Sequence, residues 1–339
     1  MEKHKDIWVV AEQNAGVLSR VSLELLSCAA RLAGELEEVT GSRPGVLAVV
    51  TGGENPREIE ELHRHGADGS ILALSPLLED YRTDLHAAVL ADLVREKMPE
   101  IVLFGATAWG SEVAPGVAAK VKTGLAAHCA DLKINPQGLL VQSVPAFGGK
   151  VLGEILCPDH RPQMASVRPG VFPAVPVDNP APVQPVMAPP NLGSEKGRIK
   201  VLEVRRQEIS GRPLEEAEVV VAGGWGVGSK ENWQLLEELA ELLGAAVGCT
   251  RPALDEGWTA GEHTMIGTSG KAVRPKVYVG FGISGATHHV VGIKDAGLVI
   301  SINTNPRAEV FQYSDVKVVA DARSVIDALI AELKVGKKD

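Results

Sequence analysis

The sequence predicts an α/β fold with two domains, each a mainly parallel sheet flanked by helices. Apolar runs alternate with amphipathic segments through residues 6–122, which is the order expected of a parallel sheet covered by helices. Three later runs, at 277–281, 298–302 and 316–319, are short and rich in β-branched residues, as strands buried on both faces are. Between these regions, residues 169–190 hold eight of the 21 prolines, a composition that forms neither helices nor central strands.

The proline-rich segment sets the expected domain boundary. We expect an N-terminal α/β domain over residues 1–190, a junction over 191–206 and a second domain over 207–339. The junction is polar and continues the extended character of the segment before it. At 339 residues the chain is long enough for two ordinary domains.

The first domain is regular up to residue 122 and less regular after it. Its patterns predict strands at 6–11, 45–50, 69–73 and 100–104, helices at 18–39, 56–65, 84–97 and 111–122, and further strands at 128–134, 138–144 and 151–156. Ser111 is the expected N-cap of the last helix. The turn at 51–56 lacks the Lys-Ser/Thr pair of a P-loop, so we interpret it as a turn that leads into a helix.

The second domain begins with a strand at 218–222 that ends in a glycine-rich turn. A helix at 230–243 with Ser229 as its N-cap and a strand at 245–248 follow. The strand at 277–281 leads through small residues into a candidate helix over 287–293. This order of elements again predicts a parallel sheet.

Small and polar residues follow several strands of the second domain. The segment Gly282–Ala286 would place free N–H groups and a positive helix end at the carboxyl edge of the sheet, where phosphate-bearing cofactors bind. Gly282 and Gly285 lack the Cβ atoms that would keep a ligand off the backbone. Similar loops lie at 267–271, 303–306 and 321–323. Each loop alone could be a simple turn, but together they favour a nucleotide-type site.

Composition and charge exclude several functional classes. Hydrophobic residues make up 45% and charged residues 23%, and the formal charge of −9 argues against a nucleic-acid partner. No apolar run approaches the roughly 18 residues that a membrane span needs. The first residues lead directly into a strand, without a secretory or transit segment, so we expect a cytoplasmic protein. The four cysteines form no CxxC pair and the histidines no HExxH, so no metal site is expected.

Several stretches of the sequence resemble one known family. In the second half these are GGWGVGSKENW, GAAVGCTRPALDEGW, GTSGK, VYVGFGISGATHH, ISINTNPRAEVFQYSD and VVAD, in that order. They resemble the flavin-binding domain of the α subunit of electron-transfer flavoprotein, a family that includes the FixB-type proteins. GATAWGSEVAPGVAAKVKTGLAA and PAFGGKVLGEILCPDHRPQMASVRPGVF extend the resemblance to the first half. It implies an N-terminal adenine-nucleotide-hydrolase-like α/β domain and a C-terminal Rossmann-like FAD-binding domain.

The resemblance also implies a function. The family forms heterodimers with a β subunit, carries one FAD in the α subunit, and moves electrons between acyl-CoA-type or related dehydrogenases and a second redox partner. Such a subunit is an electron carrier, not an enzyme with its own small-molecule substrate. A second FAD or an AMP in the β subunit would be compatible with the family. Simple electron transfer and flavin-based bifurcation both stay open.

Cofactor-binding positions carry over onto this sequence motif by motif. The matching residues are Thr250 and Arg251 against the flavin; Ile266, Gly267, Thr268 and Ser269, the last of them near flavin N5; Ser284, Gly285, Ala286, Thr287, His288 and His289; and Asn303 and Asp321 at the adenosine and ribose end. Arg251 and His289 would favour negative charge on the flavin around N1 and the C2 carbonyl. Taken from the local sequence alone, Arg251 could equally be a surface cation and His288 a solvent-facing residue.

Two of these positions, and Trp225 in the first glycine loop, depart from the usual family pattern. Trp225 stands where the first glycine loop usually has arginine, and Thr268 and His288 each stand in place of glutamine. One cation and two amides are lost near the cofactor and one titratable ring is gained. We expect FAD binding to survive with an altered potential and altered partner choice.

Two other functional classes remain at this stage. One is a stand-alone Rossmann-like nucleotide-binding protein or enzyme, which would need an acid–base set that the sequence does not display. The other is a scaffold without a redox role, which would be colourless when purified.

Overall fold

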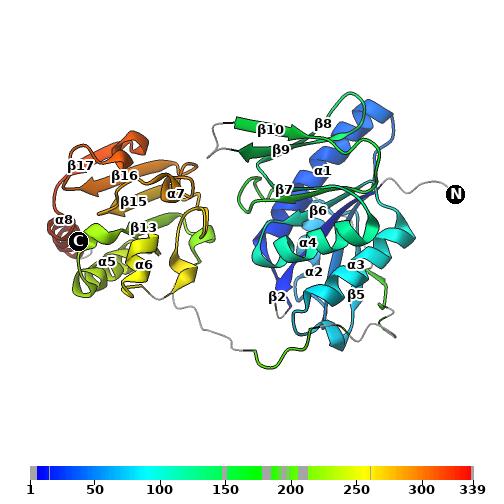
Figure 1. Ribbon diagram of the computed structural model, residues 1–339, viewed down its shortest axis with the longest axis horizontal. Helices are drawn as coiled ribbons and strands as arrows, with labels where there is room; N and C mark the ends of the chain where they lie inside the picture. The colour runs from blue at the N-terminus through cyan, green and yellow to red at the C-terminus, as the bar shows by residue number, and fades with distance from the viewer. Residues whose placement is uncertain are drawn as a thin grey trace. The chain divides into compact units, whose positions relative to one another are not determined.

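A computed structural model describes residues 6–14, 16–146, 151–177, 185–190, 192, 197, 199–204, 213–259 and 261–336. The chain divides into two compact units, Met1–Arg206 (unit 1) and Gln207–Asp339 (unit 2), shown in Figure 1. The expected junction at 191–206 groups with unit 1. Residues 1–5, on which the expectation about a leader segment rests, lie outside the described residues.

Unit 1 contains a seven-stranded sheet in the order β12-β5-β4-β1-β6-β11-β7, in which every neighbouring pair is parallel. All five residues of its central strand β1 are buried, as a strand covered on both faces requires. The elements of the unit are β1 Ile7–Ala11, β2 Gln13–Asn14, β3 Val17–Leu18, α1 Arg20–Thr40, β4 Val46–Gly52, α2 Ile59–Arg64, β5 Gly69–Leu74, η1 Pro76–Leu78, α3 Thr83–Lys97, β6 Ile101–Gly105, α4 Ala108–Val121, β7 Leu125–Cys129, β8 Asp131–Ile134, β9 Leu140–Ala146, β10 Val151–Ile155, β11 Gln163–Val167 and β12 Val186–Met187.

The two faces of this sheet carry separate hydrophobic cores. Because side chains alternate along a strand, Val9 of β1 joins the core under α1, and Trp8 and Val10 join the core under α3 and α4. The helices and strands predicted over the first 122 residues are confirmed to within three residues at each end.

The capping residue predicted for α4 was wrong. The helix begins at Ala108 instead of residue 111, because the hydroxyl oxygen of Thr107 accepts a hydrogen bond from the Gly110 N–H at 3.0 Å. Thr107 therefore satisfies one of the N–H groups that the first turn of a helix leaves unpaired. Ser111 lies inside the helix.

The second half of unit 1 differs from the expectation in two further respects. The strand expected at 128–134 is divided at Ala130 into β7 and β8, and His128, inside β7, adopts a left-handed conformation with φ 58°. The strand β11 was not predicted, although it lies between β6 and β7 in the sheet. Strands β8, β9 and β10 form a separate antiparallel sheet.

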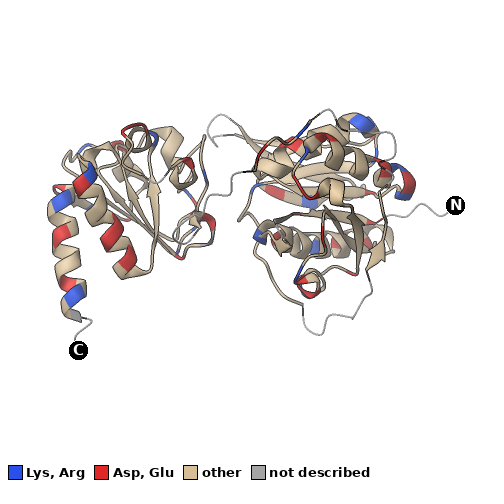
Figure 2. Cartoon of the chain, turned by 90° about the horizontal axis from the view of Figure 1, so that it is seen from below, with Lys and Arg blue, Asp and Glu red and all other residues tan. Residues whose placement is uncertain are grey.

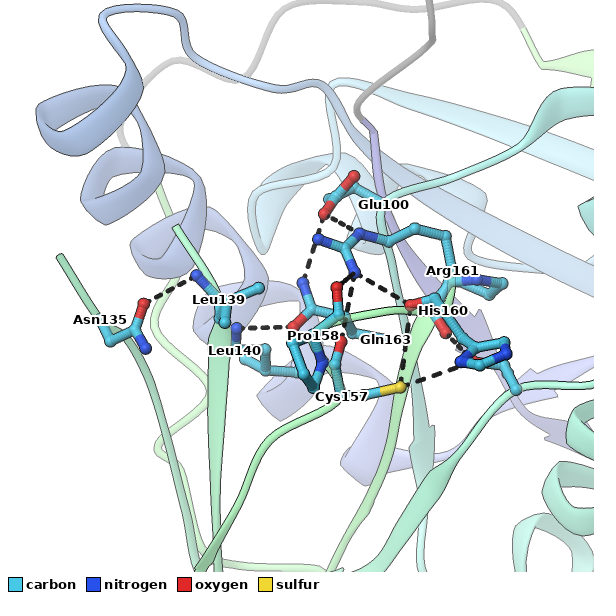
Figure 3. Close-up of polar contacts among 11 residues, drawn as sticks. Glu100, Asn135, Leu139, Leu140, Cys157, Pro158, His160, Arg161 and Gln163 are labelled. Carbon is cyan, nitrogen blue, oxygen red and sulfur yellow. Dashed lines mark hydrogen bonds and ion pairs between the residues drawn. The ribbon is translucent and has the colours of Figure 1, made fainter. Parts of the chain in front are cut away.

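Polar contacts hold β11 in the sheet at its amino end (Figure 3). The buried Gln163 side chain accepts from Leu140 N at 2.9 Å and donates to Glu100 Oε1 at 3.3 Å. Arg161 forms an ion pair with the same Glu100 carboxylate. These contacts come from residues far apart in the sequence, which is why local pattern did not indicate this strand.

Unit 2 contains a five-stranded, fully parallel sheet in the order β14-β13-β15-β16-β17. Helices α5 and α8 pack on one face through residues such as Leu236 and Ile326, and Val310 and Ile293 lie in the core of the other face. The elements are η3 Leu214–Glu216, β13 Val219–Gly223, η4 Trp225–Val227, α5 Lys230–Leu243, β14 Ala246–Cys249, α6 Arg251–Asp255, η5 Glu262–Thr264, β15 Val277–Phe281, α7 Thr287–Val290, β16 Leu298–Asn303, η6 Glu309–Tyr313, β17 Val316–Val319 and α8 Ala322–Gly336.

Most of the predicted elements of unit 2 are confirmed, including Ser229 as the N-cap of α5, whose hydroxyl accepts from Asn232 N at 3.2 Å. Helix α7 is shorter than the predicted 287–293. Helix α8 was not predicted. It carries acidic and basic residues along its length next to the C-terminus in Figure 2, and Lys334 pairs with Glu238 of α5 at 2.6 Å.

Candidate functional site

The strand order of unit 2 creates a switch point, the place at a carboxyl sheet edge where the chain connections leave in opposite directions. From β13 the chain goes to β14 on one side and then returns to β15 on the other. In open α/β sheets, ligands bind outside the carboxyl ends of strands at such a point. The strand ends are level here, since Gly223 pairs with both Cys249 and Phe281.

Glycines bring the loops after β13 and β15 into direct contact. Gly224 N donates to Phe281 O at 2.9 Å, and Gly226 N donates to Gly282 O at 3.0 Å. Gly282 has φ 62°, and a Cβ there would clash with the backbone of Gly226. These glycines therefore allow two loops to pack backbone against backbone.

Gly285 is enclosed in the same way. It has φ 95°, and a Cβ would clash with the backbone nitrogen of Val310. Gly282 and Gly285 thus make room for protein backbone, and the room for a ligand that we expected of them stays a prediction.

The loop that follows η5 packs on α7. Thr268 N donates to His288 O at 2.7 Å, and Ile266 N donates to Cys249 O at 2.9 Å. Gly267 has φ 132°, and a Cβ there would clash with the His288 carbonyl. The structure therefore brings together two groups of residues that lie about twenty positions apart in the sequence: Ile266, Gly267, Thr268 and Ser269 with Thr287, His288 and His289.

His289 lies inside this assembly, only 5% exposed. Its Nε2 is 2.8 Å from Tyr278 Oη and its Nδ1 is 3.0 Å from the Ile266 carbonyl oxygen. Burial lowers the pKa of His289 to about 4, so the ring is neutral at pH 7. A carbonyl only accepts, so Nδ1 carries the proton and Nε2 accepts from the Tyr278 hydroxyl.

Both ring nitrogens of His289 are therefore engaged with the protein. In this structure the side chain links the loop at Ile266 to β15. The hydrogen bond from this side chain to a flavin that we expected stays a prediction. His288, its neighbour, is exposed.

Thr250 and Arg251 follow β14 at the same edge. Thr250 is 7% exposed, and its N–H donates to Gly223 O at 3.0 Å, which ties it to the end of β13. Arg251 begins α6, and its exposed side chain pairs with Asp255 at 2.8 Å. The local sequence left a surface cation and a ligand open for Arg251, and its exposed position at the switch point is compatible with both.

Asn303 and Asp321 lie at the ends of β16 and β17, on the other side of the sheet edge. Asn303 Nδ2 donates to Ile283 O at 2.9 Å, and its Oδ1 accepts from Asn305 N at 2.8 Å. Asp321 Oδ1 accepts from the backbone N of Ser324 at 3.0 Å, in the first turn of α8. Both side chains thus stabilise the loops that they occupy.

The candidate residues divide into a buried framework and an exposed face. Thr250, Ile266, Gly285 and His289 are buried, and Gly267 and Asn303 are half-buried. The exposed residues are Arg251, Thr268, Ser269, Ser284, Ala286, Thr287, His288 and Asp321. The exposed face therefore carries a guanidinium, an imidazole, a carboxylate and several hydroxyl groups.

The framework also contains a residue that the sequence analysis did not single out. Tyr278, the partner of His289, is fully buried. A tyrosine inside an apolar strand was the signal that could have revealed it, since a buried hydroxyl needs a hydrogen-bond partner.

Unit 1 has a switch point of its own, between β1 and β6. Glu12 follows β1 there, 8% exposed, and both of its carboxylate oxygens lie within 2.9 Å of Thr107 Oγ1. A Cβ on Gly105 or Gly110 would lie 2.7 or 3.1 Å from Glu12 Oε1, so these glycines make room for the carboxyl group. Burial raises the pKa of Glu12 to about 7, against the opposing effect of the Thr107 hydrogen bond.

In the described part of the chain, no three His, Cys, Asp or Glu side chains come together in a group that could hold a metal ion. None of the helices in that part combines the length and the apolar character that crossing a membrane requires.

Comparison with known families identifies both units. The model of the electron transfer flavoprotein domain matches residues 7–206, and that of the electron transfer flavoprotein FAD-binding domain matches residues 213–294. The chain belongs to the electron transfer flavoprotein α-subunit family. The resemblance stated from the sequence motifs is thereby confirmed.

Relatives of this family match the chain over nearly its whole length. The electron transfer flavoprotein subunit alpha of Thermoanaerobacterium thermosaccharolyticum is 38% identical over 335 residues, covering 98% of this chain and 99% of the relative. Protein FixB of Clostridium saccharobutylicum is 40% identical over 333 residues, covering 98% and 97%. The electron transfer flavoprotein subunit alpha of Clostridium acetobutylicum is 40% identical over 335 residues, with the same coverage.

Membership in this family assigns a flavoprotein role in electron transfer, with a β subunit as partner. The matched FAD-binding segment spans β13 to α7 and so contains the loops that meet at the switch point. Asn303 and Asp321 lie beyond the matched segment.

Proposed function

We propose that this chain is the FAD-carrying α subunit of a heterodimeric electron transfer flavoprotein. It shuttles electrons between an acyl-CoA-type or related dehydrogenase and a second redox partner. One observation carries the proposal: the loop at 266–269, helix α7 and Arg251 are separated in the sequence but meet at one switch point in a family FAD-binding domain.

The edge of the unit 2 sheet fits an elongated dinucleotide. With neighbouring strands about 4.8 Å apart, its five strands span roughly 19 Å from β14 to β17. The exposed residues follow this whole edge, from Arg251 after β14 to Asp321 after β17. The flavin ring would lie at the first end and the adenosine at the second.

Bound FAD supplies the capacity to accept and release electrons. The chain's own residues bind and orient it. Arg251 places a positive charge where negative charge accumulates on reduction, and the hydroxyl of Ser269 donates a hydrogen bond. The hydroxyl of Thr268 donates to the His288 carbonyl oxygen at 3.2 Å and so orients the loop. His289 and Tyr278 keep the loop at Ile266 in position through neutral hydrogen bonds. Because helix α7 has only four residues, its dipole is small. Its backbone N–H groups therefore contribute more to cofactor binding than its dipole does.

The test is to co-express the full chain with the β subunit, purify the heterodimer, and count and identify the flavin released per heterodimer. We expect a yellow protein with one FAD in the α subunit. A second FAD, or an AMP, would then belong to the β subunit, and two FAD per heterodimer would favour the bifurcating form. A colourless heterodimer without flavin would contradict the proposal and favour a scaffold.

A further inference from the structure

Trp225 is the most exposed aromatic residue in the described part of the chain, with 64% of its surface in contact with solvent. Single apolar residues on a surface are common, so exposure alone says little. Trp225, however, is held in place. Its indole N–H donates to Glu256 Oε1 at 3.2 Å, and its neighbours Gly224 and Gly226 hydrogen-bond to the loop after β15.

The hydrogen bond to Glu256 places the indole beside α6. Glu256 is the C-cap of α6 and Arg251 is its first residue, five positions earlier. At about 1.5 Å per residue, the two positions are roughly 7.5 Å apart along the helix axis. Trp225 and Arg251 therefore belong to the same end of the sheet edge, opposite the end that carries Asp321.

We propose that Trp225 forms an aromatic contact with the isoalloxazine ring of the bound flavin. This inference rests on the proposed function. A planar apolar ring, fixed by its N–H and exposed at the switch point, provides a surface that another aromatic ring can cover. The indole contact is neutral, so Arg251 supplies the positive charge at this end of the site.

The test uses the full chain co-purified with its β subunit and stripped of flavin. Acrylamide quenching of tryptophan fluorescence is compared between wild type and Trp225→Phe, so that the difference isolates Trp225 from the other four tryptophans. We expect Trp225 to be accessible without flavin and shielded when FAD is added. ADP, which carries the adenosine end alone, should leave it accessible.

Binding affinity gives a second measurement. Trp225→Ala should weaken FAD binding about ten-fold, the typical value of one aromatic contact, and Trp225→Phe should weaken it less. Tyr313→Ala is the matched control. Tyr313 is also exposed, at 49%, but it lies near the amino ends of β16 and β17, because the nearby Asp315 N donates to Val299 O.

The possible outcomes separate the two proposals. A wild-type heterodimer that binds no FAD overturns both. If it binds FAD while Trp225 stays accessible to acrylamide, only the inference about Trp225 fails. Shielding by ADP would place the indole against the adenine, and shielding only after a dehydrogenase is added would make it a protein-docking residue; each result contradicts the contact with isoalloxazine.

Discussion

The parallel sheets of units 1 and 2 each have a switch point at their carboxyl edge, and the residues that follow the strands there differ. In unit 1 the Glu12 carboxyl group occupies the edge, bonded to Thr107 and enclosed by two glycines. In unit 2, loops pack backbone against backbone and leave the side chains above them exposed. The same topology thus encloses a protein carboxyl group in one unit and leaves polar side chains exposed in the other, so the residues at the strand ends decide what each sheet edge can bind.

The largest effect is expected where glycine enables the loop packing of unit 2. Gly285 has φ 95°, and Gly285→Ala adds a Cβ against the Val310 backbone. We therefore expect the free energy of unfolding to fall by more than about 3 kcal/mol, with loss of flavin. Gly257→Ala is the control, since Gly257 has φ 69° but open space around it, and it should cost about 1 kcal/mol. Denaturant unfolding measures both. Equal losses of unfolding free energy in the two variants would show that the close approach of Gly285 to Val310 does not affect stability.

The next effect concerns the buried carboxyl group of unit 1. The folded-state pKa of Glu12 is about 7, above its usual 4.5, so the folded protein holds this proton more tightly than the unfolded chain. Stability should therefore fall as pH rises from about 5 to about 8, by up to about 3 kcal/mol from this group. Glu12→Gln keeps an acceptor for Thr107 and removes the titration. Unfolding curves at several pH values should show a smaller slope in the variant, and an unchanged slope would disprove the assignment.

A smaller effect tests whether His289 serves the framework. Tyr278→Phe removes the hydroxyl that donates to His289 Nε2 and leaves a buried acceptor unpaired, which should cost about 1–2 kcal/mol. The folded variant should keep the FAD affinity of wild type. Unchanged stability together with a loss of FAD affinity would show that His289 contacts the cofactor and does not serve the framework.

The smallest effect on stability is expected at Arg251. Because its ion pair with Asp255 is exposed, Arg251→Ala should leave the unfolding midpoint unchanged within error. It should, however, shift the midpoint potential of bound flavin to more negative values by tens of millivolts, since the reduced form loses a nearby cation. Lys276→Ala, which removes an exposed cation at the amino end of β15, is the control. A potential that does not move would make Arg251 a surface cation only.

Periodicity and capping residues predicted most of the fold. The regular alternation up to residue 122 and the buried strands of unit 2 are local features, and so is the Ser229 cap. Strand β11 was missed because its place depends on Gln163 and Glu100, which are far apart in the sequence. The limits of α4 depended on a single side chain, Thr107.

Sequence motifs selected the candidate residues but could not indicate the contacts that each side chain makes. Motif resemblance selected Ile266 and His289 together, and the structure brings them into contact. It could not show that His289 faces Tyr278, because side-chain direction follows from packing that no local pattern encodes. Gly285 was chosen for a ligand and turned out to admit the Val310 backbone, for the same reason.

Hydrogen exchange measured by mass spectrometry, on the heterodimer with and without FAD, tests the central claim most directly. The account predicts that FAD slows exchange in the peptides that contain residues 250–251, 266–271 and 284–289, and leaves the peptides around Glu12 and Thr107 unchanged. Protection at the unit 1 switch point, with no change at the edge of unit 2, would contradict it.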